Sequence, residues 1–345
     1  MASKHISMLG AVALAAISTP SFAADVAERP LVQPDPSNWF VEAGASALAV
    51  QFPAMDFGRN MSTFPRSNGT DRGPFTPGSR YGFGAGLDLT IGYRLLNFSA
   101  PTEIYAKGSY LSANLSEGLN SNVGMVPFID GVIRPIITGG AVVGLFTPTS
   151  IALDRSQQRL GLDLGVRQTY DLGGFKVMPG VFVAYQTINQ RDTINASGAD
   201  PRTMFLRADI NGHYWRIGAS LGASLPLMAQ ISLFTNNSIS LDFLSANYSG
   251  SQTFTGTFFP APTNVALASD RLSRTTWRAN SELGVMSTNG PWTVKMSGIL
   301  EYIGAVPTVA YPQFIAGSTS VNGVARLTTA SQFSIGGRAA INYKF

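Results

Sequence analysis

Apolar and polar residues alternate with a period of two along much of this chain. In residues 157–171, Leu160 and Leu162 share one face, while Arg159 and Asp163 lie on the other. Successive side chains of a β-strand point to opposite sides, so this period predicts strands with one apolar and one polar face. Ten segments carry the pattern: 38–50, 81–96, 103–114, 157–171, 175–189, 203–225, 230–246, 271–288, 292–302 and 328–345.

The connections between these segments are alternately long and short. The long ones are 51–80, 115–156, 190–202, 247–270 and 303–327, and the short ones are 97–102, 172–174, 226–229 and 289–291. Short turns at one end and long loops at the other are typical of barrels that cross an outer membrane with an even number of strands. The sequence therefore predicts an all-β fold, a transmembrane antiparallel up-and-down β-barrel of about ten strands.

The segment 203–225 departs from simple alternation. Its apolar residues occupy even positions such as Leu206 at first and odd positions such as Trp215 later. A change of face within one strand predicts a β-bulge, which we expect near Gly212.

The connection 115–156 contains an apolar block, residues 128–146. We interpret the block as a loop folded into or over the mouth of the barrel, because Pro135 cannot donate a hydrogen bond within a central strand. The alternative is an extra hairpin that turns at Gly139 and Gly140 and raises the number of strands to twelve.

The composition favours strands that face lipid. Charged residues make up 13% of the chain, about half of the roughly 25% that is usual in soluble proteins. No segment offers the roughly 18–20 uninterrupted apolar residues that a membrane-spanning helix needs. A closed barrel is the other structure that satisfies every backbone hydrogen bond in lipid. The formal net charge of +4 is too small and too evenly spread to suggest a nucleic-acid partner.

Aromatic residues cluster near the ends of the predicted strands, as in the girdles that mark the two lipid–water interfaces of a barrel. They are Trp39, Phe40, Tyr81, Tyr93, Tyr170, Phe175, Trp292, Tyr302, Tyr343 and Phe345.

The last segment, 328–345, has the most regular alternation and ends in Phe345. A strand of this kind resembles the terminal strand of bacterial outer-membrane barrel proteins, including porins. The resemblance implies that Phe345 belongs to the signal read by the barrel-assembly machinery. It also implies a location in the outer membrane of a Gram-negative bacterium, in contact with lipid and lipopolysaccharide.

Residues 1–23 have the three parts of a secretory signal peptide. Lys4 supplies the positive charge, Met8 to Ile17 are apolar but too short to span a membrane, and Ser21 and Ala23 form a small-residue cleavage site. Residues 24–37 contain three prolines and predict an extended periplasmic lead-in, which resembles that of small alpha-proteobacterial outer-membrane barrels. The barrel domain is then expected over residues 38–345.

Candidate catalytic and metal-binding residues are few. The chain has no cysteine, and His213 is the one histidine left after removal of the signal peptide. Asp209 precedes His213 by four residues, an arrangement that resembles the Asp–His pair of omptin-type outer-membrane proteases, but no second pair of aspartates accompanies it. We therefore expect no enzymatic activity, no metal ion and no cofactor. An outer-membrane hydrolase that depends on His213 is the least favoured alternative.

The remaining candidates are charged residues on the polar faces of the strands, which we expect to line the lumen. They are Asp88, Arg94, Glu103, Lys107, Arg159, Asp163, Arg167, Lys176, Arg207, Asp209, Arg216, Arg278, Glu282, Lys295, Glu301 and Arg338.

Two functions fit this set of residues. Ion pairs that fill a narrow barrel would suit a structural surface protein, whereas a small pore would be a narrow passive channel for ions or small solutes with a slight preference for anions. The alternative from another class is a surface adhesin or ligand-binding barrel that uses its long extracellular loops.

Overall fold

A computed structural model describes residues 38–345 with internal gaps. The gaps are 55–58, 62–70, 75–78, 96–99, 121–124, 127–135, 139–140, 144–147, 199–202, 257–258, 267–268, 311–312, 315–320 and 323–324. The predicted signal peptide and the lead-in lie outside the described residues.

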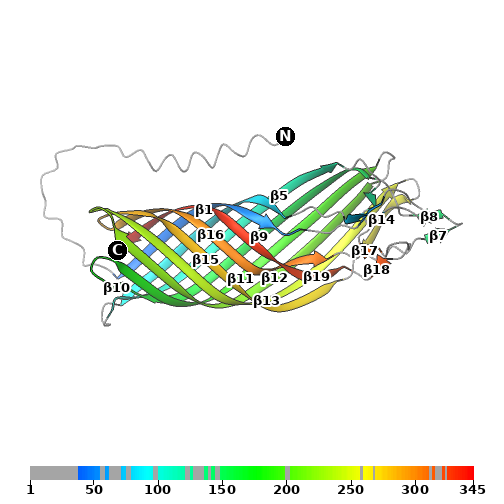
Figure 1. The fold of residues 1–345 in the computed structure, drawn as a ribbon. Helices are drawn as coiled ribbons and strands as arrows, with labels where there is room; N and C mark the ends of the chain where they lie inside the picture. Colours follow the sequence, from blue (N-terminus) through cyan, green and yellow to red (C-terminus); the bar gives the residue numbers. More distant parts are fainter. Residues whose placement is uncertain are drawn as a thin grey trace. The chain divides into compact units, whose positions relative to one another are not determined.

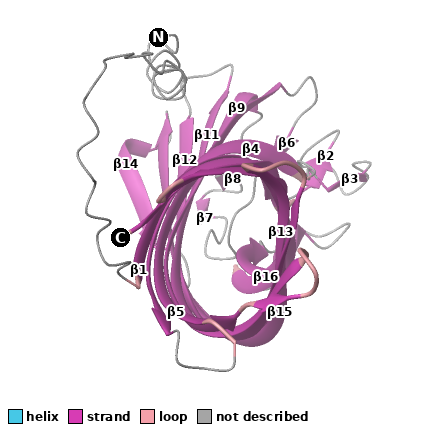
Figure 2. Ribbon diagram, turned by 90° about the vertical axis from the view of Figure 1, so that its left-hand side faces the viewer, coloured by secondary structure: helices cyan, strands magenta, loops and turns pink. Residues whose placement is uncertain are grey.

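Ten antiparallel strands close into a barrel, as the alternation predicts (Figures 1 and 2). Each strand pairs with the next along the chain, and the pairing of β1 with β19 closes the ring. The strands are β1 (Trp39–Phe52), β4 (Arg80–Leu95), β5 (Thr102–Asn120), β9 (Pro148–Gln168), β11 (Lys176–Gly198), β12 (Thr203–Pro226), β13 (Ile231–Gly256), β15 (Asp270–Asn289), β16 (Trp292–Ala310) and β19 (Arg326–Lys344).

The other strands are short. Two of them extend the barrel sheet, β10 (Tyr170–Asp171) against β11 and β14 (Phe259–Ala266) against β13. The rest form small separate sheets: β2 (Arg59–Met61), β3 (Asp71–Pro74), β6 (Met125–Val126), β7 (Ile136–Thr138), β8 (Ala141–Val143), β17 (Gln313–Phe314) and β18 (Val321–Asn322). No helix is present in the described parts of the chain.

The apolar block 128–146 does not add strands to the wall. Its described parts, β7 and β8, pair only with each other. The barrel therefore has ten strands and not twelve, while residues 128–135, 139–140 and 144–146 lie outside the described part of the chain.

The strands meet in tight connections at the end of the barrel that holds the C-terminus. Gly173 and Gly174 between β9 and β11 have φ angles of 76° and 96°, and Gly290 between β15 and β16 has a φ of 58°. Positive φ is strained for residues with a side chain, so glycine is required for these turns.

Strand β12 has no bulge near Gly212, so this prediction is wrong. Its register with β11 and with β13 is continuous through Gly212. Odd positions point outward along the whole strand, as the exposed Trp215 and Ile217 show, and even positions such as the buried Leu206 and Ile210 point inward. The side chains do not change face; the environment of each face changes along the strand.

The outer surface carries an apolar belt about ten residues tall. On β16 it runs from Trp292 to Tyr302, and on β12 from Trp215 to Leu225. Ten residues at about 3.4 Å each, tilted as barrel strands are, span roughly 25 Å, the height of the apolar band of outer-membrane barrels.

Aromatic pairs mark both edges of this belt. At the end with the short turns, the ring centroids of Trp292 and Tyr343 lie 4.5 Å apart, and Phe345 packs against Tyr343 at 4.9 Å. At the other edge, Tyr185 and Trp215 lie 4.9 Å apart. These pairs are the girdles expected at lipid–water interfaces.

Beyond the second girdle the strands continue into water. Strands β11 and β13 extend farther than the sequence predicts, whereas β12 matches its predicted bounds within one residue. Strands β11, β12 and β13 have 23, 24 and 26 residues, so each is much longer than the belt. Here the outer face is polar and the inner face is apolar, because water and not lipid surrounds this half. The inner face forms a core of Leu153, Ile188, Ile194, Leu206, Ala208, Ile210, Tyr214, Leu244, Ala246, Tyr248, Ile303, Val306, Val309, Ala325 and Leu327.

Candidate functional site

The interior of the barrel is built in layers, and the lowest layer lies near the short turns. Glu103 accepts hydrogen bonds from Arg94 and Arg167, both at 2.6 Å. Both guanidinium groups also lie over the ring of Phe40, at 5.6 and 5.8 Å from its centroid. About a third of each arginine side chain is exposed, so water reaches this layer from the end that holds the short turns.

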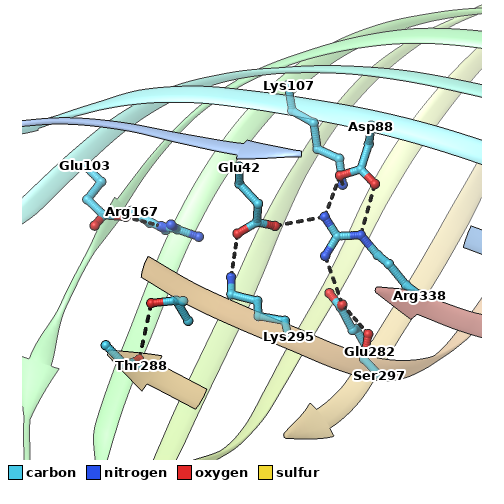
Figure 3. A network of polar contacts seen from close by, with 11 residues as sticks. Glu42, Asp88, Glu103, Lys107, Arg167, Glu282, Thr288, Lys295, Ser297 and Arg338 are labelled. Carbon is cyan, nitrogen blue, oxygen red and sulfur yellow. Dashed lines mark hydrogen bonds and ion pairs between the residues drawn. The ribbon is translucent and has the colours of Figure 1, made fainter. Parts of the chain in front are cut away.

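The second layer is organised around Arg338 (Figure 3). Its guanidinium donates to both carboxylate oxygens of Asp88, at 2.5 and 3.0 Å, and a bidentate contact of this kind is among the strongest that a guanidinium makes. It also donates to Glu42 at 2.8 Å and to Glu282 at 3.2 Å.

Two lysines complete the second layer. Lys295 donates to Glu42 at 2.6 Å, and the ammonium of Lys107 lies 3.4 Å from Asp88. Three positive and three negative charges therefore balance. Gly44 leaves the space that the network occupies, since a Cβ there would lie 2.6 Å from Asp88 and 2.7 Å from Arg338.

A third layer lies near the upper edge of the belt, and the pair at its centre is buried. Arg278 donates to Asp242 at 2.9 Å and to Gln186 at 2.7 Å, with exposures of 2% for Arg278 and 0% for Asp242. Arg159 donates to Glu301 at 2.7 Å.

Arg216 completes the third layer, 3.6 Å from both Asp163 and Asp242. This layer again holds three positive and three negative charges. Arginine therefore does not outnumber acid in either of the upper two layers, and the charge excess behind the expected anion preference is absent there.

Above the third layer, the end of β16 enters the lumen. Its register with β19 shifts between Ile303 and Val306, and all five residues from Ala305 to Val309 are buried. In a wall strand only alternate residues face inward, so burial of successive residues means that this segment bends inward, away from β15, while Val306 to Ala310 remain paired with β19. Figure 2 shows this part of β16 inside the ring of strands.

The inserted segment is anchored to β12, three strands away from β16 around the ring. The hydroxyl of Tyr214 on β12 donates to the main-chain oxygen of Ala305 at 2.9 Å. The ring of Tyr214 rests on Arg278, whose guanidinium lies 5.2 Å from its centroid. Tyr214 therefore links the apolar plug to the charged layer below it.

The third layer and the plug close the described part of the barrel. Near this level every strand contributes a buried inward residue: Leu48, Gly84, Leu111, Arg159, Gln186, Tyr214, Asp242, Arg278, Ile303 and Ser334. A path wide enough for water would expose some of these residues. The described residues leave no such path along the axis.

Most of the charges predicted to line the lumen lie in these layers. Asp88, Arg94, Arg159, Asp163, Arg167, Arg278, Glu282, Lys295, Glu301 and Arg338 all face inward and take part in them. Lys176 is exposed at the rim near the short turns. Sequence reasoning missed Glu42 and Asp242, although each is a lone acid between apolar neighbours on its strand.

Arg207 and Asp209 do not line the lumen, which corrects the prediction. They occupy odd positions of β12 and face outward, above the aromatic girdle, because the strand continues without a bulge. There Asp209 accepts hydrogen bonds from Arg207 at 2.6 Å and from Arg191 at 2.8 Å.

His213 lies on the same outer face as Asp209. Its ring is 6.0 Å from the ring of Tyr185, at the level of the girdle. No hydrogen bond or ion pair joins His213 to a carboxylate within the described residues, and Asp209 is engaged by the two arginines.

No protein-family model matches the chain, and no curated protein matches it. Among solved structures, the outer membrane protease OmpT from Escherichia coli is similar over 90% of this chain and 97% of that one, at 8% identity and a TM-score of 0.46. The translocator domain of the autotransporter NalP from Neisseria meningitidis is similar over 91% and 90%, at 13% identity and a TM-score of 0.41. The toluene transporter TbuX from Ralstonia pickettii is similar over 90% of each chain, at 12% identity and a TM-score of 0.33.

Proposed function

We propose that this chain is a surface barrel of the outer membrane that binds a ligand in its extracellular half and does not act as an open diffusion channel. The closure of the interior by the third layer and by the end of β16 carries this proposal. The narrow passive channel becomes the second candidate.

The energetics of the charged layers support a closed barrel. Removing one partner of a buried ion pair costs roughly 3–5 kcal/mol. An ion that displaced even one pair, such as Arg278 and Asp242, would meet a barrier that slows its passage by a factor on the order of a hundred or more. The third layer contains three acids and three arginines, so several pairs would have to separate together.

The extracellular half offers the surface for a ligand. The strand ends that the long connections join all belong to this half, well above the girdle of Tyr185 and Trp215. A polar outer face and a packed apolar interior make this half resemble a water-soluble barrel. We also propose that the belt contacts lipopolysaccharide and that the barrel-assembly machinery recognises Phe345.

Single-channel conductance in a planar bilayer tests the proposal. We expect the purified, refolded protein to show no discrete steps above the lipid background, and liposomes that contain it to swell no faster than empty ones. A heat-induced shift in gel mobility serves as the control for folding. Regular steps from folded protein would overturn the proposal in favour of the channel.

The second candidate is a channel that opens when the end of β16 moves. The plug is a strand end and not a complete domain, so a modest rearrangement would displace it. Tyr214→Phe removes the hydroxyl that anchors Ala305, and Tyr110→Phe on the outer face is the matched control. A gated channel would gain openings with Tyr214→Phe alone, whereas we expect both variants to stay silent.

The proposal includes the lack of enzymatic activity. His213 is the one histidine in the described part of the chain, and it faces outward beside Tyr185. We expect His213→Ala to leave protease and lipase assays unchanged from those of the unaltered protein. A hydrolytic activity that disappears with this substitution would revive the hydrolase alternative.

A further inference from the structure

The wall of the barrel is incomplete between β15 and β16 in the extracellular half. Strand β15 pairs with β13 as far as Asp270, but it pairs with β16 only from Arg278 to Asn289. Residues Asp270 to Trp277 have no ladder partner on the β16 side within the described chain. The result is a slit in the wall, because the end of β16 has turned into the lumen.

Two residues of β16 suit this bend. A Cβ at Gly304 would lie 2.7 Å from the hydroxyl of Thr276 and 3.1 Å from the main-chain oxygen of Trp277, so the absence of a side chain at Gly304 helps β16 to cross β15 this closely. Pro307 has no N–H and is tolerated in a strand that has one free edge. The slit is therefore built into the sequence of β16.

Side chains, and not a main-chain ladder, span the slit. The N–H of Leu327 on β19 donates to the carboxylate of Asp270 at 2.8 Å. The guanidinium of Arg274 donates to the hydroxyl of Thr329 at 2.5 Å. Each contact joins β15 to β19 past the missing part of β16, and each can open without unfolding a strand.

The slit connects the apolar core of the barrel with the outer edge of the lipid belt. Inside it lie Ile303, Val306 and Leu327 of the core, with the half-buried Leu272 against them. At its lower end, Trp277 and Tyr302 form a girdle pair with centroids 4.7 Å apart. Ile303 and Val306 are fully buried, so a molecule dissolved in the outer leaflet reaches them only when the side chains that span the slit separate, and it then bypasses the extracellular connections.

We propose that this slit is the entrance to a binding site for small apolar molecules that partition into the outer leaflet, a ligand class that rests on the proposed function. The core behind the slit is almost entirely apolar, with the hydroxyl of Thr308 as a buried polar exception, and the two charged groups that span the slit, Asp270 and Arg274, already have partners. A charged or strongly polar ligand would lose its hydration without replacement there, whereas an apolar ligand exchanges lipid for protein contacts. Binding displaces side chains of the core around Val306.

Tryptophan fluorescence tests the site directly, with 1-bromohexane as an apolar probe that quenches indole through its heavy atom. The chain has four tryptophans, at positions 39, 215, 277 and 292. One variant keeps only Trp277, and a matched variant keeps only Trp292 at the opposite girdle. Their exposures are 48% and 51%, so the two report on lipid-dissolved probe about equally.

In nanodiscs, we expect quenching of Trp277 to contain a saturable component that hexane competes away. Quenching of Trp292 should rise with the probe without saturating, since it reports partition into lipid alone. If the two tryptophans respond alike, the site does not exist.

A disulfide across the slit adds a second test. Because the Thr276 hydroxyl lies 2.7 Å from the Cβ position of residue 304, cysteines at both positions fall within the roughly 3.5–4.5 Å between β-carbons that a disulfide needs. The chain has no other cysteine. In the variant that combines Thr276→Cys and Gly304→Cys with the single Trp277, we expect oxidation to abolish the saturable component and reduction to restore it.

Saturable quenching that persists in the oxidised variant would overturn the slit as the entrance. None of these readouts depends on conductance. A conducting barrel with this quenching would overturn the proposed function alone, and a silent barrel without it would overturn only the site.

Discussion

At the scale of single residues, the charged side chains inside the barrel are held in ion pairs, so the effect of losing one depends on its partners. Arg338 contacts three carboxylates, those of Glu42, Asp88 and Glu282, from three other strands. Each of these carboxylates is mostly buried, so loss of the arginine leaves negative charges close together with little water. Arg207 has the same chemistry on the outer surface, where water screens it.

We therefore expect Arg338→Gln to lower the free energy of unfolding by about 3–5 kcal/mol, the usual cost of removing one partner of a buried ion pair. Arg207→Gln is the control, and it should cost less than about 1 kcal/mol because Asp209 is exposed and keeps Arg191. Urea titration followed by gel mobility measures both values. Equal losses would mean that Arg338 is solvated and that its layer is not closed.

At the scale of strands, the alternation of apolar and polar residues predicts which side chains face the lumen within the belt, but not above it. Alternation placed Arg159 and Asp163 in the lumen because apolar residues face lipid there. On β12 above Trp215, the same rule placed Leu206 outside, because nothing in the alternation states where lipid ends and water begins. Only the continuous register of β12 with its neighbours separates a bulge from a change of environment.

The bend of β16 was missed for a different reason. Pro307 is compatible with a free strand edge and Gly304 with a close approach of two strands, but the sequence pattern predicts a loop from residue 303 onward. Residues Ala305 to Val309 carry no alternation, since both of their faces are buried. A short apolar run of this kind fits a loop, a core strand or a plug equally well until its partners are known.

The change of environment along β12 has a measurable consequence. Leu221 and Asn211 both face outward, Leu221 near the middle of the belt and Asn211 above the girdle. We expect Leu221→Arg to destabilise the barrel by about 2–4 kcal/mol in lipid vesicles, the cost of arginine near the membrane midplane. Asn211→Arg should change the stability by less than about 1 kcal/mol, and similar costs at both positions would mean that the belt extends past Trp215.

At the scale of the whole molecule, the barrel exists only if its first and last strands pair. Ala47 and Leu48 of β1 lie against Gly336 and Gly337 of β19 in this pairing. The two glycines are adjacent in sequence but differ in their surroundings. A Cβ at Gly336 would overlap the main-chain oxygen of Ala47 and lie 2.8 Å from Leu48, whereas the nearest atom to a Cβ at Gly337 is 3.7 Å away.

This difference allows closure to be tested without altering the charged layers. Gly336→Val places a side chain against the backbone of β1 and should prevent the two strands from pairing, so we expect little or no heat-modifiable, compact band after refolding. Gly337→Val adds the same atoms on the lipid-facing side and should refold as the unaltered protein does, since overpacking costs energy only where neighbours cannot move away. Equal refolding yields would mean that the β1–β19 pairing tolerates a shift. In that case closure would depend on the Arg338 layer, which joins β19 to β1 and β4 through side chains, more than on the fit of the two backbones.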